Sequence, residues 1–469
     1  LAFNQGITRR GSYAAYSDID HPEIEEFINM RKESGGDINR KCLNIHNAVN
    51  ITDEFLTAVR TDEEWRLIDP KSGEAVKTIS ARDLWWQILN ARAETGEPYM
   101  INIDRCNESL PQEQKDLGLT INQSNLCSEI VLPTNEERTA VCCLSSVNLE
   151  HFDKWKKNKQ FIDDLITMLD NVLEHFIEAI VDTSGLGGYN ANFKRFKNYV
   201  KEEKEGMVKA AYSAYRERSL GLGAMGFHAY LQNKKLPFQG LQSTSTNHVM
   251  FSHIKGKASE ATERLAEERG EAPDVHGSNQ RNAHLLAIAP NASSSIICGG
   301  TSPSIEPFRA NSFTHKTLSG SYQVKNKYLE RLLKKKGLNV EEREKVWKDI
   351  AGTNGSVQHL DILDDDEKEI FKTAPEINQI YLVEHAHMRQ EYICQSQSVN
   401  LFFTMPKATE PQEVHDDYLQ YVNDVHWYAM NKLKSLYYFR SDAARSAENV
   451  NIKIPRVKLE DVDCLSCEG

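Results

Sequence analysis

The chain has 469 residues and a formal net charge of −12, and 40% of its residues are hydrophobic. This composition is typical of a globular protein with one large domain or two to three smaller ones. The acidic balance argues against binding polymeric nucleic acid through its phosphates. The sequence contains no run of 18 apolar residues that would predict a membrane-spanning helix, and its N-terminal residues do not resemble a secretory signal.

The cysteine content indicates a reducing compartment. An odd number of cysteines in a large chain without a signal predicts thiols used for chemistry or metal binding rather than for disulfides. We therefore expect a cytoplasmic protein. The nine cysteines are Cys42, Cys106, Cys127, Cys142, Cys143, Cys298, Cys394, Cys464 and Cys467.

Strand and helix patterns alternate along the chain. Residues 5–11 predict a loop, 12–16 a short strand, and 21–28 a helix with a proline at its start. Residues 42–45 and 48–51 predict strand, and Thr52 is a good cap for the helix that follows. Further helices are predicted near 81–94, 160–183, 246–269, 339–351, 375–392 and 411–434. Further strands are predicted at 98–103, 140–149, 284–289, 398–403 and 435–439. This alternation favours an α/β fold with a largely parallel sheet, open or closed.

The last segment, residues 441–469, has a different character. It is charged and poor in aromatic residues, and near its end Cys464 and Cys467 are separated by two residues. This composition predicts a mobile tail that carries two thiols. One cysteine pair supplies only half of a typical tetrahedral zinc site, so redox chemistry is the better interpretation and no metal is expected.

The segment around Cys127 offers an amide, a thiol and a carboxylate. If it is extended, the two-residue period of a strand places Asn125, Cys127 and Glu129 on one face. The alternative is the edge of a surface strand that carries a thiol by chance. This pattern alone does not separate the two interpretations.

Two further segments carry small polar residues or thiols. Residues 140–149 predict a buried strand in which Cys142 and Cys143 face opposite ways, so one of the two is expected to be structural. An apolar run then leads into Pro290, Asn291, Ala292, Ser293 and Ser294. Such a turn, if it begins a helix, offers backbone N–H groups to a phosphate. The common alternative is a serine-rich helix cap.

Near the end, Tyr437 and Tyr438 are adjacent in a short run with strand character. Aromatic residues in strands usually serve packing. Neighbouring tyrosines would also suit stepwise movement of electrons and protons, because each phenol can be oxidised.

Taken together, these segments resemble the large subunit of class I ribonucleotide reductases. Matching segments also include residues 9–16, 218–223 and 390–397, and the resemblance extends from Gly6 through the rest of the chain. It implies a ten-stranded α/β barrel of two five-stranded parallel halves, with the Cys127 segment as a central finger loop. Residues 1–440 would then be the catalytic portion and 441–469 the redox tail.

The resemblance implies a role for each candidate residue. Cys127 would carry the thiyl radical that abstracts the ribose 3′ hydrogen of a ribonucleoside diphosphate. Glu129 would accept the 3′-hydroxyl proton as a general base, and Asn125 would hydrogen-bond the substrate. Cys142 would belong to the dithiol that reduces the 2′ position, and Cys464 and Cys467 would re-reduce it by thiol exchange.

The remaining implied roles concern binding and radical delivery. The turn from Pro290 to Ser294 would bind the substrate diphosphate. Tyr437 and Tyr438 would carry the radical from a separate small subunit, whose tyrosyl radical depends on a diiron-type metal site. Nucleotide allosteric effectors would act through a loop that contains Arg9, Arg10 and Gly11. Thioredoxin or glutaredoxin would be the reductant, and an oligomer is expected.

The sequence begins inside the family's pattern, so an N-terminal part of the barrel is expected to be missing. That part would hold the ATP region, much of the specificity site and the redox partner of Cys142, because Cys42 and Cys106 lie outside the expected motif. We therefore expect that repeated turnover requires a separate N-terminal polypeptide.

Three other interpretations fit parts of the sequence. Residues 221–226 fit the dinucleotide fingerprint GxGxxG of dehydrogenases, but residues 215–219 before them are not an apolar strand. A non-catalytic scaffold or assembly subunit derived from the reductase is the main alternative. A cobalamin-dependent reductase shares the cysteine chemistry, although the Tyr437–Tyr438 pair favours class I.

Overall fold

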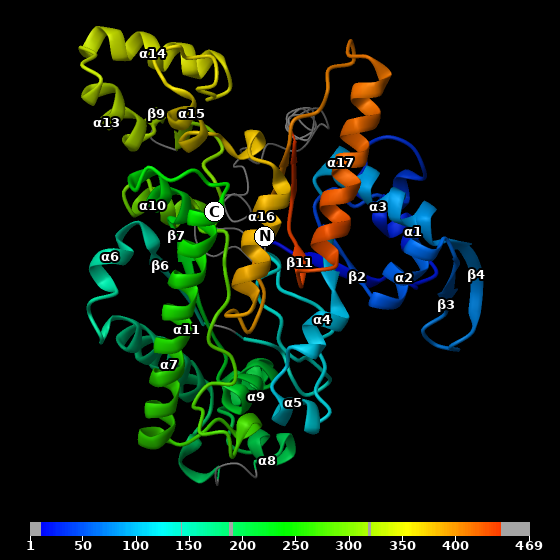
Figure 1. Cartoon of the computed structure of the whole chain (residues 1–469). Coiled ribbons are helices and arrows are strands. Elements are labelled where there is room, and N and C mark those ends of the chain that lie inside the picture. Colours follow the sequence, from blue (N-terminus) through cyan, green and yellow to red (C-terminus); the bar gives the residue numbers. More distant parts are fainter. Residues whose placement is uncertain (1–10, 142, 187–190, 318–319, 442–469) are drawn as a thin grey trace.

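A computed structural model describes residues 11–141, 143–186, 191–317 and 320–441 (Figure 1). Strands and helices alternate along the chain. The strands are β1 (Ala14–Asp18), β2 (His46–Ile51), β3 (Glu64–Ile68), β4 (Ala75–Ser80), β5 (Tyr99–Asn102), β6 (Cys143–Asn148), β7 (Leu220–Met225), β8 (Ser312–Thr317), β9 (Gly320–Lys325), β10 (Leu401–Phe403), β11 (Ser435–Leu436) and β12 (Phe439–Ser441).

The helices differ greatly in length. The longer ones are α2 (Asp53–Thr61), α3 (Ala81–Thr95), α7 (Phe161–Ile180), α9 (Val208–Glu217), α11 (Leu241–Arg269), α13 (Lys327–Lys335), α14 (Val340–Gly352), α16 (Gln379–Gln390) and α17 (Gln412–Met430). The shorter ones are α1 (Ile24–Ile28), α4 (Ile103–Glu108), α5 (Gln112–Asp116), α6 (Phe152–Trp155), α8 (Phe193–Lys197), α10 (Phe227–Asn233), α12 (Ala292–Ile297) and α15 (Asp365–Ile370).

Strand pairing, single bridges and the direct passage of the chain from β11 to β12 together link the central strands into one series. The first sheet has the order β1-β2-β5-β11, with β1, β2 and β5 parallel and β11 antiparallel to β5. The chain continues from β11 into β12, which pairs in parallel with β10. Single bridges join Gln397 to Ile288 and Leu286 to Leu222 of β7, and β7 pairs in parallel with β6. Within the described residues this series is open, with β1 and β6 as its two edges.

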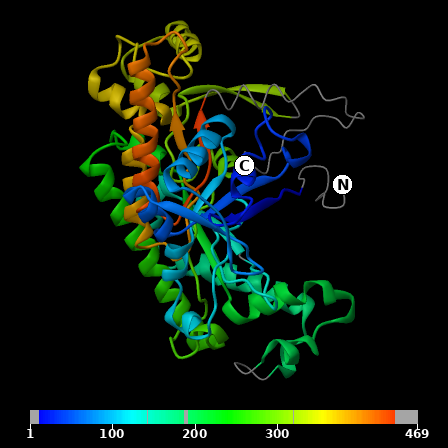
Figure 2. The same cartoon turned by 90° about the vertical axis from the view of Figure 1, so that its right-hand side faces the viewer.

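Helices cover the outside of the strands. In Figure 1, α7 and α11 lie side by side. Helix α16 lies next to α11, and α17 and α3 lie on the far side of α16. The quarter-turn view shows the strands behind this helical layer (Figure 2). Buried apolar side chains from both layers, among them Leu84, Ile88, Leu173 and Leu222, form the main core. Burying each such side chain contributes roughly 1.5–3 kcal/mol.

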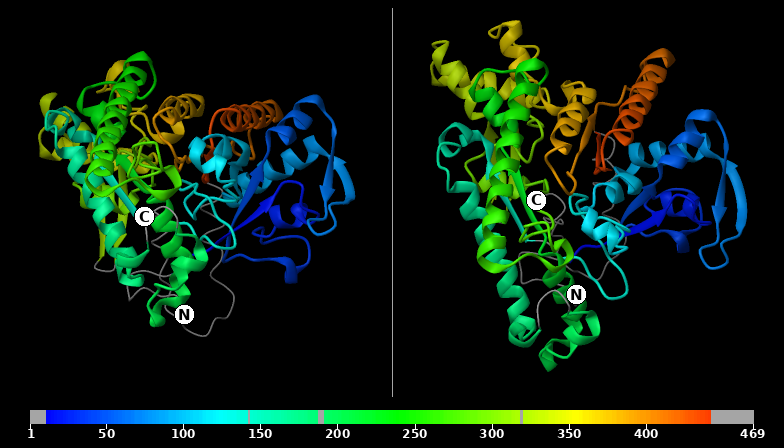
Figure 3. Two further views of the ribbon diagram at one scale, coloured as in Figure 1. Left: turned by 90° about the horizontal axis from the view of Figure 1, so that it is seen from below. Right: turned by 60° about the horizontal axis from the view of Figure 1, so that its bottom comes forward.

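The segment that follows α5 lies at the centre of the molecule, between two groups of elements. From below, the elements of the first hundred residues and the α7–α11 helices lie on opposite sides (Figure 3). The cyan segment after α5 lies between them. A smaller unit of α13, α14 and α15 has its own apolar cluster, which includes Leu329, Trp347 and Phe371.

Most predicted elements are confirmed. Each of the six longer predicted helices overlaps an observed one, namely α3, α7, α11, α14, α16 and α17. The Thr52 hydroxyl caps α2 by accepting a hydrogen bond from the Phe55 N–H. The prediction of a strand at residues 42–45 was wrong, since regular strand pairing begins only at His46. Strands β3, β4, β7, β8 and β9 were not predicted.

The α/β class is confirmed, but the described residues do not form a closed ten-stranded barrel. Strand β11 pairs antiparallel with β5, with Ser435 opposite Ile101. The other pairings of the central series are parallel, so the largely parallel arrangement agrees with the prediction.

Candidate active site

The Cys127 segment is a tight turn, so the extended conformation on which a shared strand face would depend is not present. The Ser128 N–H donates to the Asn125 carbonyl (3.1 Å), and the Asn125 N–H donates to the Ile130 carbonyl (3.0 Å). The Asn125 side-chain oxygen accepts the Ile130 N–H (3.1 Å). Ser128 has a φ of +64°, which lies in the left-handed region that few non-glycine residues adopt. We call residues 125–130 the finger turn.

Serine residues from two distant segments hold the finger turn. The Ser398 hydroxyl lies 2.5 Å from the Cys127 carbonyl oxygen and 3.3 Å from Glu129 Oε2. The Ser396 N–H donates to the Glu129 carbonyl (2.9 Å), and the Ser435 hydroxyl donates to the Ser128 carbonyl (3.0 Å). Because Ser396 and Ser398 precede β10 and Ser435 is the first residue of β11, the turn is attached to the central strand series.

Glu129 is buried against this framework, and burial raises its pKa to about 7. Hydrogen bonds from its own backbone, from Asn125 and from Ser398 oppose the shift. A carboxyl group with a pKa near neutral can take up and release a proton under physiological conditions. The geometry therefore suits Glu129 to acid–base chemistry beside Cys127.

Tyr437 and Tyr438 lie next to the turn. The Tyr437 hydroxyl donates to the Cys127 sulfur at 3.6 Å, and the two tyrosine ring centroids are 4.2 Å apart. Both rings are at least nine-tenths buried, and burial raises the pKa of Tyr437 well above its ordinary value. Cys127, Tyr437 and Tyr438 thus form a contiguous line of oxidisable side chains.

Two tyrosines that sequence reasoning had not assigned to the site also contact it. The Tyr16 hydroxyl of β1 donates to the Asn125 carbonyl (2.5 Å) and lies 3.0 Å from Ser124 Oγ. Tyr99 of β5 packs on both Tyr437 and Tyr438, with ring centroids 4.8 Å and 5.2 Å away. Local patterns carry no signal for either contact, because both depend on strand pairing across the sheet.

The predicted phosphate turn follows the extended segment that pairs with β7. Asn291 has a φ of +55°, and α12 begins after it at Ala292, as expected. The Asn291 amide donates to Ser146 Oγ of β6 (3.0 Å) and to the Ala289 carbonyl (2.9 Å). Pro290 and Ala292 are half-buried, whereas Ser293 and Ser294 are exposed. The turn is connected to the finger turn through Ile288, whose carbonyl accepts the Ser398 N–H (2.9 Å).

Several predicted site residues cannot be placed. Cys142, Cys464, Cys467, Arg9 and Arg10 lie outside the described residues. Gly11, the next residue of the predicted effector loop, is exposed. Cys143 is described at the start of β6, where it packs against the main core.

The dinucleotide fingerprint is embedded in a strand. The first two glycines of the fingerprint, Gly221 and Gly223, lie in β7, whose residues are all buried. They are not in a turn that could bind a phosphate. A Cβ atom on Gly223 would lie 2.6 Å from the Ala287 carbonyl oxygen. Gly223 therefore permits close approach between backbone segments, which removes the main support for a dehydrogenase.

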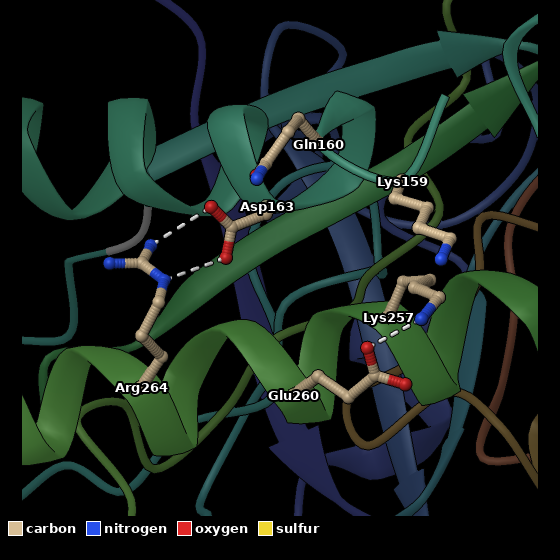
Figure 4. A pocket seen from close by; sticks show the side chains of 6 residues that line it. All are labelled: Lys159, Gln160, Asp163, Lys257, Glu260 and Arg264. Carbon is tan, nitrogen blue, oxygen red and sulfur yellow. Dashed lines mark hydrogen bonds and ion pairs between the residues drawn. The ribbon is translucent and has the colours of Figure 1, made fainter.

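A separate charged groove of about 490 Å³ lies between α7 and α11 (Figure 4). Arg264 pairs with Asp163 (2.9 Å), and Lys257 pairs with Glu260 (2.5 Å). Because these charges already neutralise one another, the groove is a weaker candidate than the finger turn. Its lining residues are Lys159, Gln160, Asp163, Lys257, Glu260 and Arg264.

Within the part of the chain that the structure describes, none of the helices combines the length and apolar character needed to cross a membrane. The same residues contain no group of three or more His, Cys, Asp or Glu side chains placed to hold a metal ion.

A family model for the ribonucleotide reductase barrel domain matches residues 1–280 and 273–439. This chain belongs to the ribonucleotide reductase family. Among similar members, the ribonucleoside-diphosphate reductase large subunit of Invertebrate iridescent virus 3 is 43% identical over 525 residues, which cover 100% of this chain and 78% of the relative. A relative from Frog virus 3 (isolate Goorha) is 44% identical over 469 residues, with 100% and 76% covered.

A solved ribonucleotide reductase structure has a similar fold. The class Id ribonucleotide reductase alpha subunit of Actinobacillus ureae superposes with a TM-score of 0.73 at 34% identity. The match covers 93% of this chain and 71% of that chain. Both the sequence and the backbone therefore support membership of this reductase family.

Proposed function

We propose that this chain is the catalytic large subunit of a ribonucleoside-diphosphate reductase, with Cys127 as its radical-bearing residue. The observation that carries the proposal is the position of the Cys127 sulfur. It contacts the Tyr437 hydroxyl and lies in the same turn as buried Glu129. The large-subunit relatives named above support the same reaction class.

Each residue then has a defined task. A radical from a separate small subunit oxidises Tyr438, then Tyr437, and then Cys127, each residue supplying one electron and one proton. The Cys127 thiyl removes the 3′ hydrogen of the ribose, Glu129 accepts the 3′-hydroxyl proton, and Asn125 hydrogen-bonds the substrate. The turn from Pro290 to Ser294 binds the diphosphate. At the end of the reaction Cys127 returns the hydrogen atom to C3′.

The reduction also requires two further electrons. We propose that Cys142 and a partner thiol supply them, so that water leaves from the 2′ position and a disulfide forms. Cys464 and Cys467 would re-reduce this disulfide and would themselves be reduced by thioredoxin or glutaredoxin. Nucleotide effectors would act through the loop of Arg9, Arg10 and Gly11. The small subunit would hold the diiron-type metal site.

The open strand series supports the proposal of a further polypeptide segment. Within the described residues, β1 and β6 each pair along one edge only, and an unpaired edge exposes backbone N–H and C=O groups. Strands from an N-terminal portion of the large subunit, added between β1 and β6, would close a ten-stranded barrel around the finger turn. Those strands would also bring the redox partner of Cys142.

The test replaces the proposed radical residue in the reconstituted enzyme. The chain, the N-terminal portion and the small subunit are combined, and deoxyribonucleoside diphosphate formation is measured. Cys127→Ser should abolish product formation. Cys42→Ser is the matched control, because Cys42 is also half-buried and has no proposed role, and it should retain activity. Activity in Cys127→Ser would refute the assignment and favour a scaffold role.

A further inference from the structure

The Asn125 carbonyl group accepts a short hydrogen bond from a tyrosine of β1. The Tyr16 hydroxyl oxygen lies 2.5 Å from the Asn125 carbonyl oxygen and 3.0 Å from Ser124 Oγ. Strand β1 places the tyrosine, because Tyr16 pairs with Ala48 of β2 and its ring packs against the apolar cluster that includes Tyr437. The finger turn is therefore held from the β1 side as well as by the serines of the segments that lead into β10 and β11.

The hydrogen of the Tyr16 hydroxyl is directed at the Asn125 carbonyl. Burial raises the pKa of Tyr16 well above its ordinary value, although a hydrogen bond with Ser124 opposes the rise. The phenol therefore keeps its one hydrogen, and a carbonyl oxygen can only accept it. The Ser128 N–H donates to the same oxygen (3.1 Å), which fills both of its lone pairs. The Ser124 hydroxyl, 3.1 Å from this carbonyl, therefore donates to the Tyr16 oxygen instead.

The Asn125 side chain connects this backbone contact to Glu129. Its amide oxygen accepts the Ile130 N–H (3.1 Å), so its NH₂ group is the part that can donate. A hydrogen bond from Asn125 is one of those that lower the pKa of Glu129 against the effect of burial. The amide can serve both partners only while the Asn125 backbone keeps one orientation. The Tyr16 contact holds the carbonyl group of that backbone.

We propose that Tyr16 is a positioning residue whose O–H holds the Asn125 carbonyl and thereby keeps the Asn125 amide on the Glu129 carboxyl group. The inference rests on the proposed role of Glu129 as the general base. Tyr16 acts through Asn125 and takes no part in the proton or radical steps. Such positioning matters, because a misplacement of about 1 Å can cost on the order of 10² in rate.

Replacing Tyr16 with phenylalanine removes the hydroxyl and keeps the ring in its cluster. The Asn125 amide should then lose part of its hydrogen bond to Glu129, which should raise the pKa of that carboxyl group above its value of about 7. We expect an upward shift of about 0.5 to 1 pH unit, which is the roughly threefold to tenfold equilibrium effect of one ordinary hydrogen bond. The turnover number kcat should fall about 10-fold.

Other groups near Glu129 do not account for such a shift. Cys127 in the same turn and Tyr16 on β1 are its titratable neighbours, and the segment before β10 presents the Ser398 hydroxyl, which does not titrate in this range. Because Tyr16 is uncharged near neutral pH, Tyr16→Phe removes no charge from the site. A change in the titration of Glu129 in this variant would therefore report on its hydrogen bonds.

The experiment follows Glu129 in the reconstituted enzyme, in which the chain is combined with the N-terminal portion and the small subunit. Infrared difference spectroscopy records the titration of the carboxyl group, with Glu129→Gln as the blank, and the pH dependence of kcat/KM is measured in parallel. In Tyr16→Phe both midpoints should move upward. Tyr230→Phe is the matched control, because Tyr230 is also half-buried and its hydroxyl donates to Asp153 (3.2 Å) outside the finger turn. It should move neither midpoint.

Two double variants separate positioning from a general structural effect. In Asn125→Ala the infrared midpoint should already be raised, and adding Tyr16→Phe should move it no further, because the two residues act through one path. A further shift in that background would overturn the inference. Ser124→Ala combined with Tyr16→Phe removes the hydroxyl that could replace the lost donor, so it should give the full shift.

The outcomes distinguish this inference from the proposed function. An unchanged midpoint in the Ser124→Ala, Tyr16→Phe double variant would overturn the inference and leave the role of Glu129 intact. Equal kcat/KM in the native enzyme and in Glu129→Gln would refute Glu129 as the general base, and the inference with it.

Discussion

The Tyr437 hydroxyl oxygen lies 3.6 Å from the Cys127 sulfur, although 310 positions separate the two residues in the chain. Tyr437 lies between β11 and β12, and Cys127 lies at the tip of the finger turn. The contact exists because residues 396–398 bind the finger turn on one side and the Tyr437 N–H donates to the Val399 carbonyl (2.9 Å) on the other. The proposed radical path therefore depends on the short segment before β10.

Replacing Tyr437 with phenylalanine tests this contact. The variant keeps the ring and its stacking but removes the hydroxyl group beside the sulfur. We expect product formation to be lost, because phenylalanine cannot be oxidised at this step, while the free energy of unfolding changes by about 1 kcal/mol or less. Steady-state assay and urea denaturation measure the two effects. Normal turnover by Tyr437→Phe would exclude Tyr437 from the path.

Removing the Ser398 hydroxyl should displace the finger turn. Ser398→Ala leaves the Cys127 carbonyl without its 2.5 Å partner, which should destabilise the protein by about 1–3 kcal/mol. A misplaced sulfur should also lower kcat about 100-fold. Ser243→Ala is the control, because it removes an equally buried hydroxyl bonded to the Phe238 carbonyl at 2.8 Å. The control should lose comparable stability but little activity; equal activity losses in both variants would contradict a specific role for Ser398.

Stability should depend on pH through Glu129. Burial raises its pKa from an ordinary value of 4.5 to about 7, so the folded state keeps a proton that the unfolded chain loses within this interval. Stability should therefore fall as pH rises from about 4.5 through 7, by a few kcal/mol at most. Glu129→Gln cannot ionise and should reduce this slope in urea denaturation, whereas exposed Glu108→Gln should not. The same slope in both variants would contradict the assignment.

The catalytic dependence on pH should have the opposite sign. A general base acts in its ionised form, so kcat/KM should rise with pH through about 7. Glu129→Gln should lower kcat/KM by about 10²- to 10⁴-fold. Initial rates measured as a function of pH check both the rise in kcat/KM and the effect of Glu129→Gln. If kcat/KM stays constant from about one pH unit below this pKa to about one unit above it, Glu129 is not the base.

Gly223→Ala tests the close approach between β7 and the segment before the phosphate turn. The added Cβ would lie 2.6 Å from the Ala287 carbonyl oxygen, and such overpacking costs about 1–3 kcal/mol. We also expect KM for the diphosphate substrate to rise, because residues 290–294 follow this segment directly. Gly256→Ala, at an exposed position of α11, has open space around it and should stabilise the helix by up to about 1 kcal/mol. Thermal unfolding and substrate titration measure the effects, and a neutral Gly223→Ala would contradict the packing argument.

Local sequence patterns predicted much of the secondary structure. They failed where contacts with distant segments determine the backbone conformation. Helices such as α7 and α17 follow from apolar spacing, because that spacing describes one buried face. Strand β7, with Gly221 and Gly223 in its interior, was missed because glycine is unfavourable in strands and is used here for close contact. The local residue pattern does not show the finger turn, because its conformation depends on bonds from Ser396, Ser398 and Ser435.

By itself, the sequence determined the candidate residues: the thiol of Cys127, the carboxyl group of Glu129 and the paired tyrosines are identifiable from residue type and order, and the roles proposed for them follow from the family resemblance. Only the tertiary structure decided how they meet. Asn125, Cys127 and Glu129 gather around a turn rather than along a strand face, and Tyr16 and Tyr99 reach the site across strand pairings. The physical reason is that side-chain chemistry is a property of one residue, whereas distance, burial and the pKa of Glu129 depend on segments far apart in the chain.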